Sequence, residues 1–368
     1  MYTTAKPTLL LAFLLYFLSL LGQDHIPGKI DKLAQKAISN QGFPALSIGI
    51  YKGGKVYKSH YGALDTEKGH PPTDNTLYEI ASVTKTFTGC LLAQAVLDGK
   101  LTLVDDIRTY LPKELNSLTY GKEPIQIQHL ITHTSGLPFI LPTEIQQLYD
   151  HPDSQLPFKI ATIEKAYSKA GFLKDLETLT LEQKPGSSYS YSDVGAEIIG
   201  LILEQVYQQS FERLLTEHLF LKAQMLASKI SLSEGEKANL APGYDGTGQL
   251  MPYSQSKLWA AGAGIKTTLP DLIKYVALQL DEELPFIQES HRLLYQDKAN
   301  SLSYFWNIGE SKSGGTYLYH HGGAFGAQNW LLIYPQLDIG ITILTNQSAP
   351  ETSGKLAELA NDLFQIVK

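Results

Sequence analysis

The sequence predicts an α/β fold of the α+β type: an antiparallel sheet built from both ends of the chain and flanked by helices, with an inserted, mostly helical lobe. Alternating apolar runs occur near the beginning of the chain, β-rich runs return near its end, and the signals between them are helical. With 368 residues, 43% of them hydrophobic, the chain can bury a large core.

The first elements expected after the N-terminal segment are a helix and a hairpin. Residues 30–38 have the spacing of an amphipathic helix. Residues 45–51 and 55–61 alternate on either side of Gly53-Gly54, which predicts two paired strands.

The remaining elements divide into a helical middle and a β-rich end. An apolar run over 77–81 leads into a helix that Gly99 ends, and 103–253 has helical signals interrupted by proline-containing stretches at 137–142 and 151–157. Two β-rich runs, 329–334 and 339–344, precede an amphipathic helix over 355–367. We therefore expect the helical middle to cap the sheet, and binding sites favour such junctions.

Ser82-Val83-Thr84-Lys85 places a hydroxyl and an amine three residues apart at a helix start. Side chains at i and i+3 share a helix face, so an unprotonated Lys85 can take the proton of Ser82 without a third residue. Free N–H groups at the helix N-terminus also favour a developing negative charge. The pattern indicates a serine acyl-transfer enzyme. A capping serine followed by a solvated lysine is the alternative.

The same tetrad occurs at Ser254-Gln255-Ser256-Lys257, so the pattern alone does not identify a nucleophile. Apolar residues recur at helical spacing after Ser82, whereas Ser254 follows Met251-Pro252-Tyr253 in polar loop sequence. The context favours Ser82.

The segment from Tyr78 to Thr88 resembles the serine β-lactamase superfamily. It is most similar to the branch of class C β-lactamases, D-alanyl-D-alanine carboxypeptidases, D-aminopeptidases and β-lactamase-like esterases. Further similar motifs follow in the family's order: Gly99-Lys100-Leu101 with Asp105-Asp106, Leu130 to Pro138, Pro185-Gly186, Tyr191-Ser192-Asp193, Gly262-Ala263-Gly264 with Thr268 and Asp271, and His320-His321-Gly322-Gly323. The resemblance implies one β-lactamase-like or transpeptidase-like catalytic domain over 24–368. Its α/β lobe would cover about 24–104 and 255–368, and its helical lobe about 105–254.

Tyr191-Ser192-Asp193 is the second chemical motif. A phenol beside a lysine serves as a base if the positive charge lowers its pKa from about 10. The resemblance places Tyr191 at the catalytic tyrosine and Asp193 where the family often has asparagine. Asp193 could pair with Lys85, hold it protonated and shift the base role to Tyr191; which of the two is the principal base stays open. Asp193 is also expected as the N-cap of a helix over 194–207.

His320-His321-Gly322-Gly323 is the third motif. The glycines allow a strand edge to approach a ligand closely, and the N–H groups of Gly323 and Ser82 would hold the acyl oxygen. By resemblance, His320 occupies the lysine position of the lactamases' K-T-G motif and His321 the threonine position. Histidine there is found in esterases and peptidase-like members, which argues against a dedicated β-lactamase. A hydrogen-bonded strand end is the alternative interpretation.

The N-terminus predicts export. Lys6 precedes an apolar run over 9–21 that ends at Gly22, so we interpret 1–23 as a signal peptide, with an uncleaved membrane anchor as the alternative. The mature protein would be periplasmic or secreted. Cys90 is the only cysteine, so no disulfide forms within the chain.

Several other classes are disfavoured. The net charge is −7 and the basic residues do not cluster, which argues against nucleic-acid binding. His129 and His133 have the spacing of a zinc pair, but no third ligand is evident, and no serine lies in G-x-S-x-G. We expect no metal or organic cofactor, and the oligomeric state is not predicted.

The sequence thus predicts a serine hydrolase that forms an acyl-enzyme on Ser82 and hydrolyses an ester or a D-amino-acid-type amide. The residues expected to contact the substrate are Asp193, His320, His321 and Gly322. A β-lactamase or D,D-carboxypeptidase proper, and a slowly deacylating penicillin-recognising sensor or binding module, are the alternatives.

Overall fold

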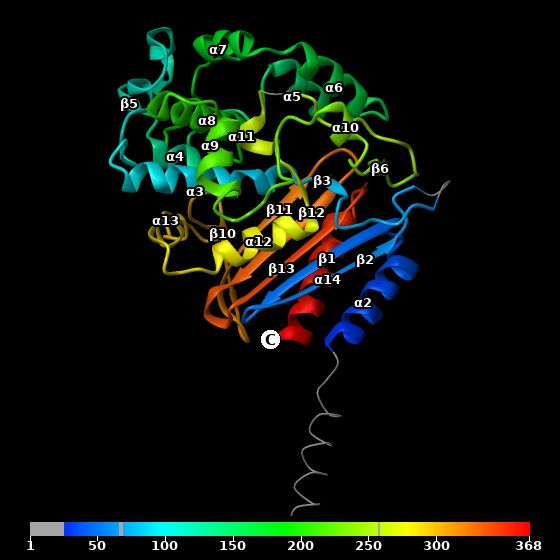
Figure 1. Cartoon of the computed structure of the whole chain (residues 1–368). Coiled ribbons are helices and arrows are strands. Elements are labelled where there is room, and N and C mark those ends of the chain that lie inside the picture. Colours follow the sequence, from blue (N-terminus) through cyan, green and yellow to red (C-terminus); the bar gives the residue numbers. More distant parts are fainter. Residues whose placement is uncertain (1–25, 66–68, 257) are drawn as a thin grey trace, which may run out of the picture.

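The computed structural model describes residues 26–65, 69–256 and 258–368 (Figure 1). The expected signal peptide lies outside the described residues. Among those residues, none of the helices has the length and apolar character needed to cross a membrane.

An eight-stranded sheet forms the base of the molecule, with the strand order β2-β1-β13-β12-β11-β10-β9-β8. All of its pairings are antiparallel. The strands are β1 Ala45–Lys52, β2 Lys55–Gly62, β8 Tyr295–Gln296, β9 Ser301–Leu302, β10 Asn307–Ser311, β11 Gly315–Gly323, β12 Gln328–Tyr334 and β13 Ile339–Thr345. The predicted hairpin at 45–61 and the predicted strands at 329–334 and 339–344 are therefore confirmed.

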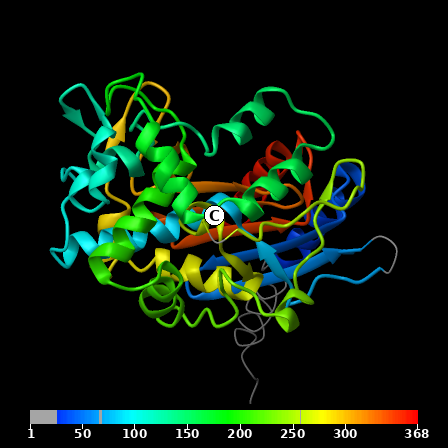
Figure 2. The same cartoon turned by 90° about the horizontal axis from the view of Figure 1, so that it is seen from above.

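One pairing within the sheet joins strands from near the two ends of the described chain. β1 lies beside β13, with Leu46 opposite Thr345 and Lys52 opposite Ile339. In Figure 2 the blue and the orange-red strands accordingly lie side by side although they are distant in sequence. This arrangement confirms the predicted fold class.

Both faces of the sheet are covered. α2 Ile26–Gln41 and α14 Thr352–Val367 pack against each other and against one face, where they bury an apolar cluster that includes Ile48, Ile341 and Phe364. α12 Leu269–Gln279 crosses the other face above β1 and β13. A Cβ on Gly340 would lie 2.0 Å from Val276 of α12, so this close approach requires glycine.

The middle of the chain supplies a lobe of helices above the sheet (Figures 1 and 2). Its helices are α3 Thr84–Leu97, α4 Ile127–Ile131, α5 Thr143–Asp150, α6 Leu156–Ala166, α7 Lys169–Thr178, α8 Asp193–Tyr207, α9 Phe211–Leu215, α10 Glu234–Lys237, α11 Ala260–Ala263 and α13 Pro285–Ser290. Short two-stranded pairings join β3 Leu77–Glu79 to β7 Lys266–Thr268, β4 Thr119–Tyr120 to β5 Glu123–Pro124, and β6 Tyr244–Asp245 to β14 Gln347–Ser348.

α3 lies at the base of this lobe, on the side of the sheet (Figure 1), and is buried along most of its length. Phe87 stacks on Tyr275 of α12 with ring centroids 3.6 Å apart. Cys90 is buried beside the hydroxyl of Tyr275 and the amide of Gln279. The helix is thereby held between α12 and the other helices, and its N-terminus lies at the junction of the lobe and the sheet.

Candidate active site

Ser82 lies on a short 3₁₀ turn, η1 Ala81–Val83, between β3 and α3. The preceding residue, Ala81, has a φ of +43°. Left-handed backbone is unfavourable for a residue with a Cβ, and such strain persists only where the surroundings fix it. The N–H of Ile80 donates to the carbonyl of Ile265 at 3.2 Å, which helps to hold the turn.

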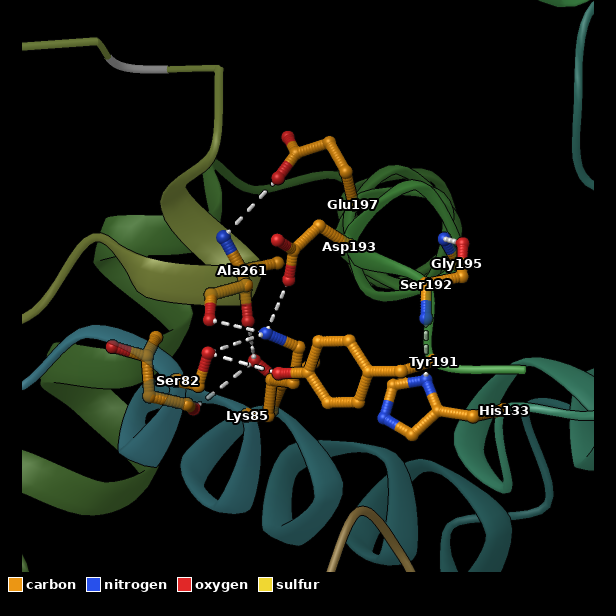
Figure 3. A network of polar contacts seen from close by, with 12 residues as sticks. Ser82, Lys85, His133, Tyr191, Ser192, Asp193, Gly195, Glu197 and Ala261 are labelled. Atoms are coloured by element: carbon orange, nitrogen blue, oxygen red, sulfur yellow. Dashed lines mark hydrogen bonds and ion pairs between the residues drawn. The ribbon is translucent and has the colours of Figure 1, made fainter. Parts of the chain in front are cut away.

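Ser82, Lys85 and Tyr191 meet at one point (Figure 3). The Nζ of Lys85 lies 3.1 Å from Ser82 Oγ, and the hydroxyl of Tyr191 lies 2.9 Å from the same atom. Lys85 is fully buried and also donates to the carbonyl of Gly262 at 2.9 Å. Two groups able to exchange a proton therefore contact the candidate nucleophile.

Asp193 is the counter-ion of Lys85. Its Oδ1 lies 2.5 Å from Lys85 Nζ, so the predicted contact between the two residues is present. Burial alone would lower the pKa of Lys85, but Asp193 and Tyr191 outweigh it and raise this pKa to about 12. Burial raises the pKa of Tyr191. The positive charge of Lys85 lowers this pKa but does not outweigh burial, and Asp193 raises it further. The resting site therefore holds an ammonium group on Lys85 and a neutral phenol on Tyr191.

The prediction that Asp193 caps α8 is wrong. The N-cap is Ser192, whose hydroxyl oxygen accepts a hydrogen bond from the N–H of Gly195 at 3.1 Å. Asp193 is instead the first residue of α8, and its side chain reaches Lys85. The carboxylate can turn away because the neighbouring serine already satisfies a free N–H of the helix.

His133 is a neighbour of Tyr191 that the sequence motifs do not place in the site. The two ring centroids are 4.3 Å apart, and the N–H of Ser192 donates to His133 Nδ1 at 3.2 Å. The N–H of Ser190 donates to the His133 carbonyl at 2.7 Å. His133 thus holds the segment that carries Tyr191 from both sides. No sequence motif identifies this role, because it depends on the approach of 190–192 to the end of α4.

The end of β11 forms the other wall of the site. A Cβ on Gly322 would lie 2.2 Å from the carbonyl oxygen of Ile80, so only glycine allows this strand to approach the Ser82 turn so closely. The side-chain amide of Asn329 on β12 donates to the Gly322 carbonyl at 3.3 Å. Gly323 is exposed and lines the same cavity as Ser82.

The two histidines of β11 differ in their surroundings. His320 is buried, and its Nδ1 lies 2.8 Å from the carbonyl of His321, to which it donates. Burial lowers the pKa of His320 to about 3, and Lys85 acts in the same direction. His321 is half-buried, with Nε2 3.2 Å from Gln328 Oε1. His320 is therefore neutral at pH 7.

A cavity of about 640 Å³ opens over Ser82. Its lining includes most of the residues singled out by the sequence: Ser82, Tyr191, Asp193, His320, His321 and Gly323. None of the described residues that line it is a lysine or an arginine. The arrangement suits nucleophilic attack by Ser82 on a carbonyl held in this cavity.

The second tetrad lies in a different setting. Ser254 is in an irregular segment and also lines the cavity, but its contact is through its backbone N–H, which donates to Glu79 Oε1 at 2.8 Å. Lys257 lies outside the described residues. His129, considered above as half of a zinc pair, accepts the backbone N–H of Gln126 through Nδ1.

Known structures share this fold. A class C β-lactamase superposes with a TM-score of 0.81 at 20% sequence identity, covering 93% of this chain and 96% of that one. A D-alanine carboxypeptidase AmpC from Burkholderia cenocepacia superposes with a TM-score of 0.79 at 21% identity, covering 93% and 99%. The fold is that of the serine β-lactamases of class C.

The sequence places the chain within one family. The family model described as Beta-lactamase matches residues 30–365, so the chain belongs to this family. The resemblance noted from the motifs is confirmed. Protein flp of Staphylococcus aureus strain N315 is 26% identical over 344 residues, which cover 90% of this chain. A β-lactamase of Lysobacter lactamgenus is 28% identical over 282 residues, 74% of this chain and 67% of its own length. The chain spans 65% of the length of the staphylococcal relative.

Proposed function

We propose that this protein is a serine hydrolase that forms an acyl-enzyme on Ser82 and hydrolyses an ester or a D-amino-acid-type amide. The observation that carries the proposal is the contact of Ser82 Oγ with both Lys85 Nζ and the Tyr191 hydroxyl, at 3.1 and 2.9 Å, beneath an open cavity. A serine is a weak nucleophile unless a neighbouring group takes its proton.

The chemistry follows from these contacts. Ser82 Oγ forms a bond to the substrate carbonyl carbon while its proton passes to the Lys85–Tyr191 pair. The bond to the leaving group then breaks, and the pair returns the proton to that group. Water repeats the sequence on the acyl-enzyme and releases the acid. Backbone N–H groups of Ser82 and Gly323 are the proposed donors to the oxyanion.

Asp193 sets the protonation state in which this machinery rests. Its negative charge favours the protonated forms of both Lys85 and Tyr191. The pair can accept the proton of Ser82 only after either Lys85 or Tyr191 has lost one proton. We therefore expect the acylation rate to rise with pH through the neutral range.

Neutral substrates are favoured over carboxylate-bearing lactams in this proposal. A carboxylate is best held by a permanent cation, and the described lining of the cavity offers a neutral His320 and no lysine or arginine. Esters and uncharged amides do not need such a partner. We also propose, from residues 1–23 of the sequence, that the protein is exported.

A full progress curve on 4-nitrophenyl butyrate tests the proposal, together with the intact mass of the protein during turnover. Many turnovers and a transient mass increase equal to one butyryl group are expected. A single stoichiometric burst would indicate a slowly deacylating sensor instead. A parallel panel of short-chain esters, D-amino-acid peptides and a chromogenic cephalosporin would rank the substrate classes, and a strong preference for the cephalosporin would identify a β-lactamase.

A further inference from the structure

The cavity over Ser82 has an acidic wall. Three carboxylates line it: Glu79 of β3, Glu164 of α6 and Asp193 of α8. Asp193 is neutralised by Lys85. Glu79 is buried, accepts the N–H of Ser254 and feels the positive charge of Lys266. These two groups have partners within the protein.

Glu164 differs from the other two. It is half-buried and makes no hydrogen bond or ion pair with another residue in the part of the chain that the structure describes. Burial raises its pKa to about 7, and the nearby charges of Asp193 and Glu79 add to this effect while Lys266 opposes it. A positively charged ligand in the cavity would stabilise the ionised form of Glu164 and lower its pKa.

Aromatic side chains line the same cavity. Besides Tyr191, they are Phe139, Tyr149, Trp259, Tyr319 and Phe325. The face of an aromatic ring attracts a cation, and a quaternary ammonium group is favoured in such surroundings because it loses little hydration on binding. Carboxylates and aromatic rings together complement a large, weakly hydrated cation.

We propose that the Ser82 cavity takes esters or amides that carry a quaternary ammonium or similar cationic group, and that Glu164 is the residue that holds the charge. The inference rests on the proposed function and names its substrate class. With an uncharged substrate, the cavity would present a half-buried carboxyl group that has no partner among the described residues, and ionisation of this group would be costly.

Matched substrates test the proposal on either side of the scissile bond. On the acyl side, 4-nitrophenyl 4-(trimethylammonio)butanoate is compared with 4-nitrophenyl 5,5-dimethylhexanoate, which has the same shape and no charge. On the leaving-group side, acetylthiocholine is compared with 3,3-dimethylbutyl thioacetate. The readout is the ratio of kcat/KM for the cationic and neutral members of each pair.

Glu164→Gln separates recognition from the intrinsic reactivity of the substrates. We expect this variant to lower the cationic-to-neutral ratio by about tenfold in at least one pair, the size of one well-placed charge contact. Glu144→Gln is the matched control, because Glu144 is exposed on the neighbouring α5 and does not line the cavity. It also replaces a carboxyl group by an amide, but outside the cavity, so its ratio should equal that of the wild type. Equal ratios in the wild type and Glu164→Gln for both pairs would overturn the proposal.

A binding measurement keeps the inference independent of catalysis. Calorimetry with phenyltrimethylammonium should show binding to the wild type and to Ser82→Ala, and about tenfold weaker binding to Glu164→Gln. Binding that is absent, or equal in all three proteins, would overturn the cation site even if neutral esters are hydrolysed. Turnover that is absent with every ester while the cation binds through Glu164 would reject the hydrolase and keep the cation site.

Discussion

Lys85 Nζ lies closer to Asp193 Oδ1, at 2.5 Å, than to Ser82 Oγ, at 3.1 Å. This ion pair joins the first turn of α3 to the first residue of α8, beneath the Tyr191 ring, whose centroid is 4.9 Å from the same Nζ. The carboxylate therefore acts on the pKa values of both groups that can accept the serine proton.

Asp193→Asn should move the pH dependence of acylation. Asp193 raises the pKa values of Lys85 and Tyr191, so removal of its charge lowers both. The group that must lose a proton then does so at lower pH, and the rising limb of the kcat/KM profile should shift to lower pH by about one unit, equivalent to ~1.4 kcal/mol. An unchanged profile between pH 5 and 9 would show that the ion pair does not control the base.

Ser82→Ala should abolish turnover and leave the fold intact, because it removes one oxygen from an otherwise unchanged turn. Ester hydrolysis and the thermal melting temperature are the measurements. Residual activity within about tenfold of the wild type, a change of only ~1.4 kcal/mol in the barrier, would contradict the assignment. Ser254→Ala is the control from the second tetrad. This variant keeps the backbone N–H that donates to Glu79, so its rate of ester hydrolysis should be close to that of the wild type.

Lys85→Ala and Tyr191→Phe should each slow acylation by about 10²- to 10⁴-fold, the usual range for a general acid or base. Both contact the same oxygen, so the double variant should cost much less than the product of the two effects. Pre-steady-state release of 4-nitrophenol measures this step. Multiplicative losses would mean that the two groups do not act as a unit.

Wild-type protein should prefer an ester to a cephalosporin at both pH 6 and pH 8, because burial keeps His320 neutral throughout this range. His320→Lys should shift the preference toward the carboxylate-bearing substrate by about 1 to 2 kcal/mol. The ratio of kcat/KM for the two substrates is the measurement. If the wild type prefers the cephalosporin at both pH values and the substitution changes nothing, His320 does not contact the substrate.

Ala81 gives a test of the backbone at the nucleophile. Its φ of +43° suits glycine, so Ala81→Gly should keep activity and change the free energy of unfolding by less than about 1 kcal/mol. Ala81→Val adds a branched Cβ in left-handed backbone and should destabilise the protein by at least ~1 kcal/mol. Urea denaturation would compare the three proteins. Equal stability of the valine and glycine variants would contradict a strained turn.

The sequence predicted the elements whose periodicity is local. The hairpin at 45–61, the strands of the C-terminal part and the apolar lead-in to Ser82 are present, and the predicted helix over 30–38 is part of the longer α2. Helix ends were less accurate, because capping depends on a single side chain. Asp193 and Ser192 are both good N-cap residues, and only the position of Lys85 shows why serine takes that role.

Two residues around the site, Glu164 and His133, could not be placed from the sequence for a physical reason. Glu164 is the single acid of α6, and the sequence of that helix gives no sign that this side chain lines the Ser82 cavity. His133 itself has left-handed backbone just beyond α4, and it contacts Tyr191 from there. Both placements depend on contacts between elements far apart in the chain. Motifs report local chemistry and not the approach of remote segments.

The pairing of β1 with β13 has a consequence for synthesis of the protein. The Ser82 turn is synthesised early. β11, whose Gly322 packs against this turn, and β13, which pairs with β1, are synthesised near the end of the described chain. Until then β1 has only β2 beside it, and its other edge is free to pair with a second molecule. Such distant pairings close slowly, so the nascent chain passes through a long interval in which it has no assembled cavity and is prone to aggregation.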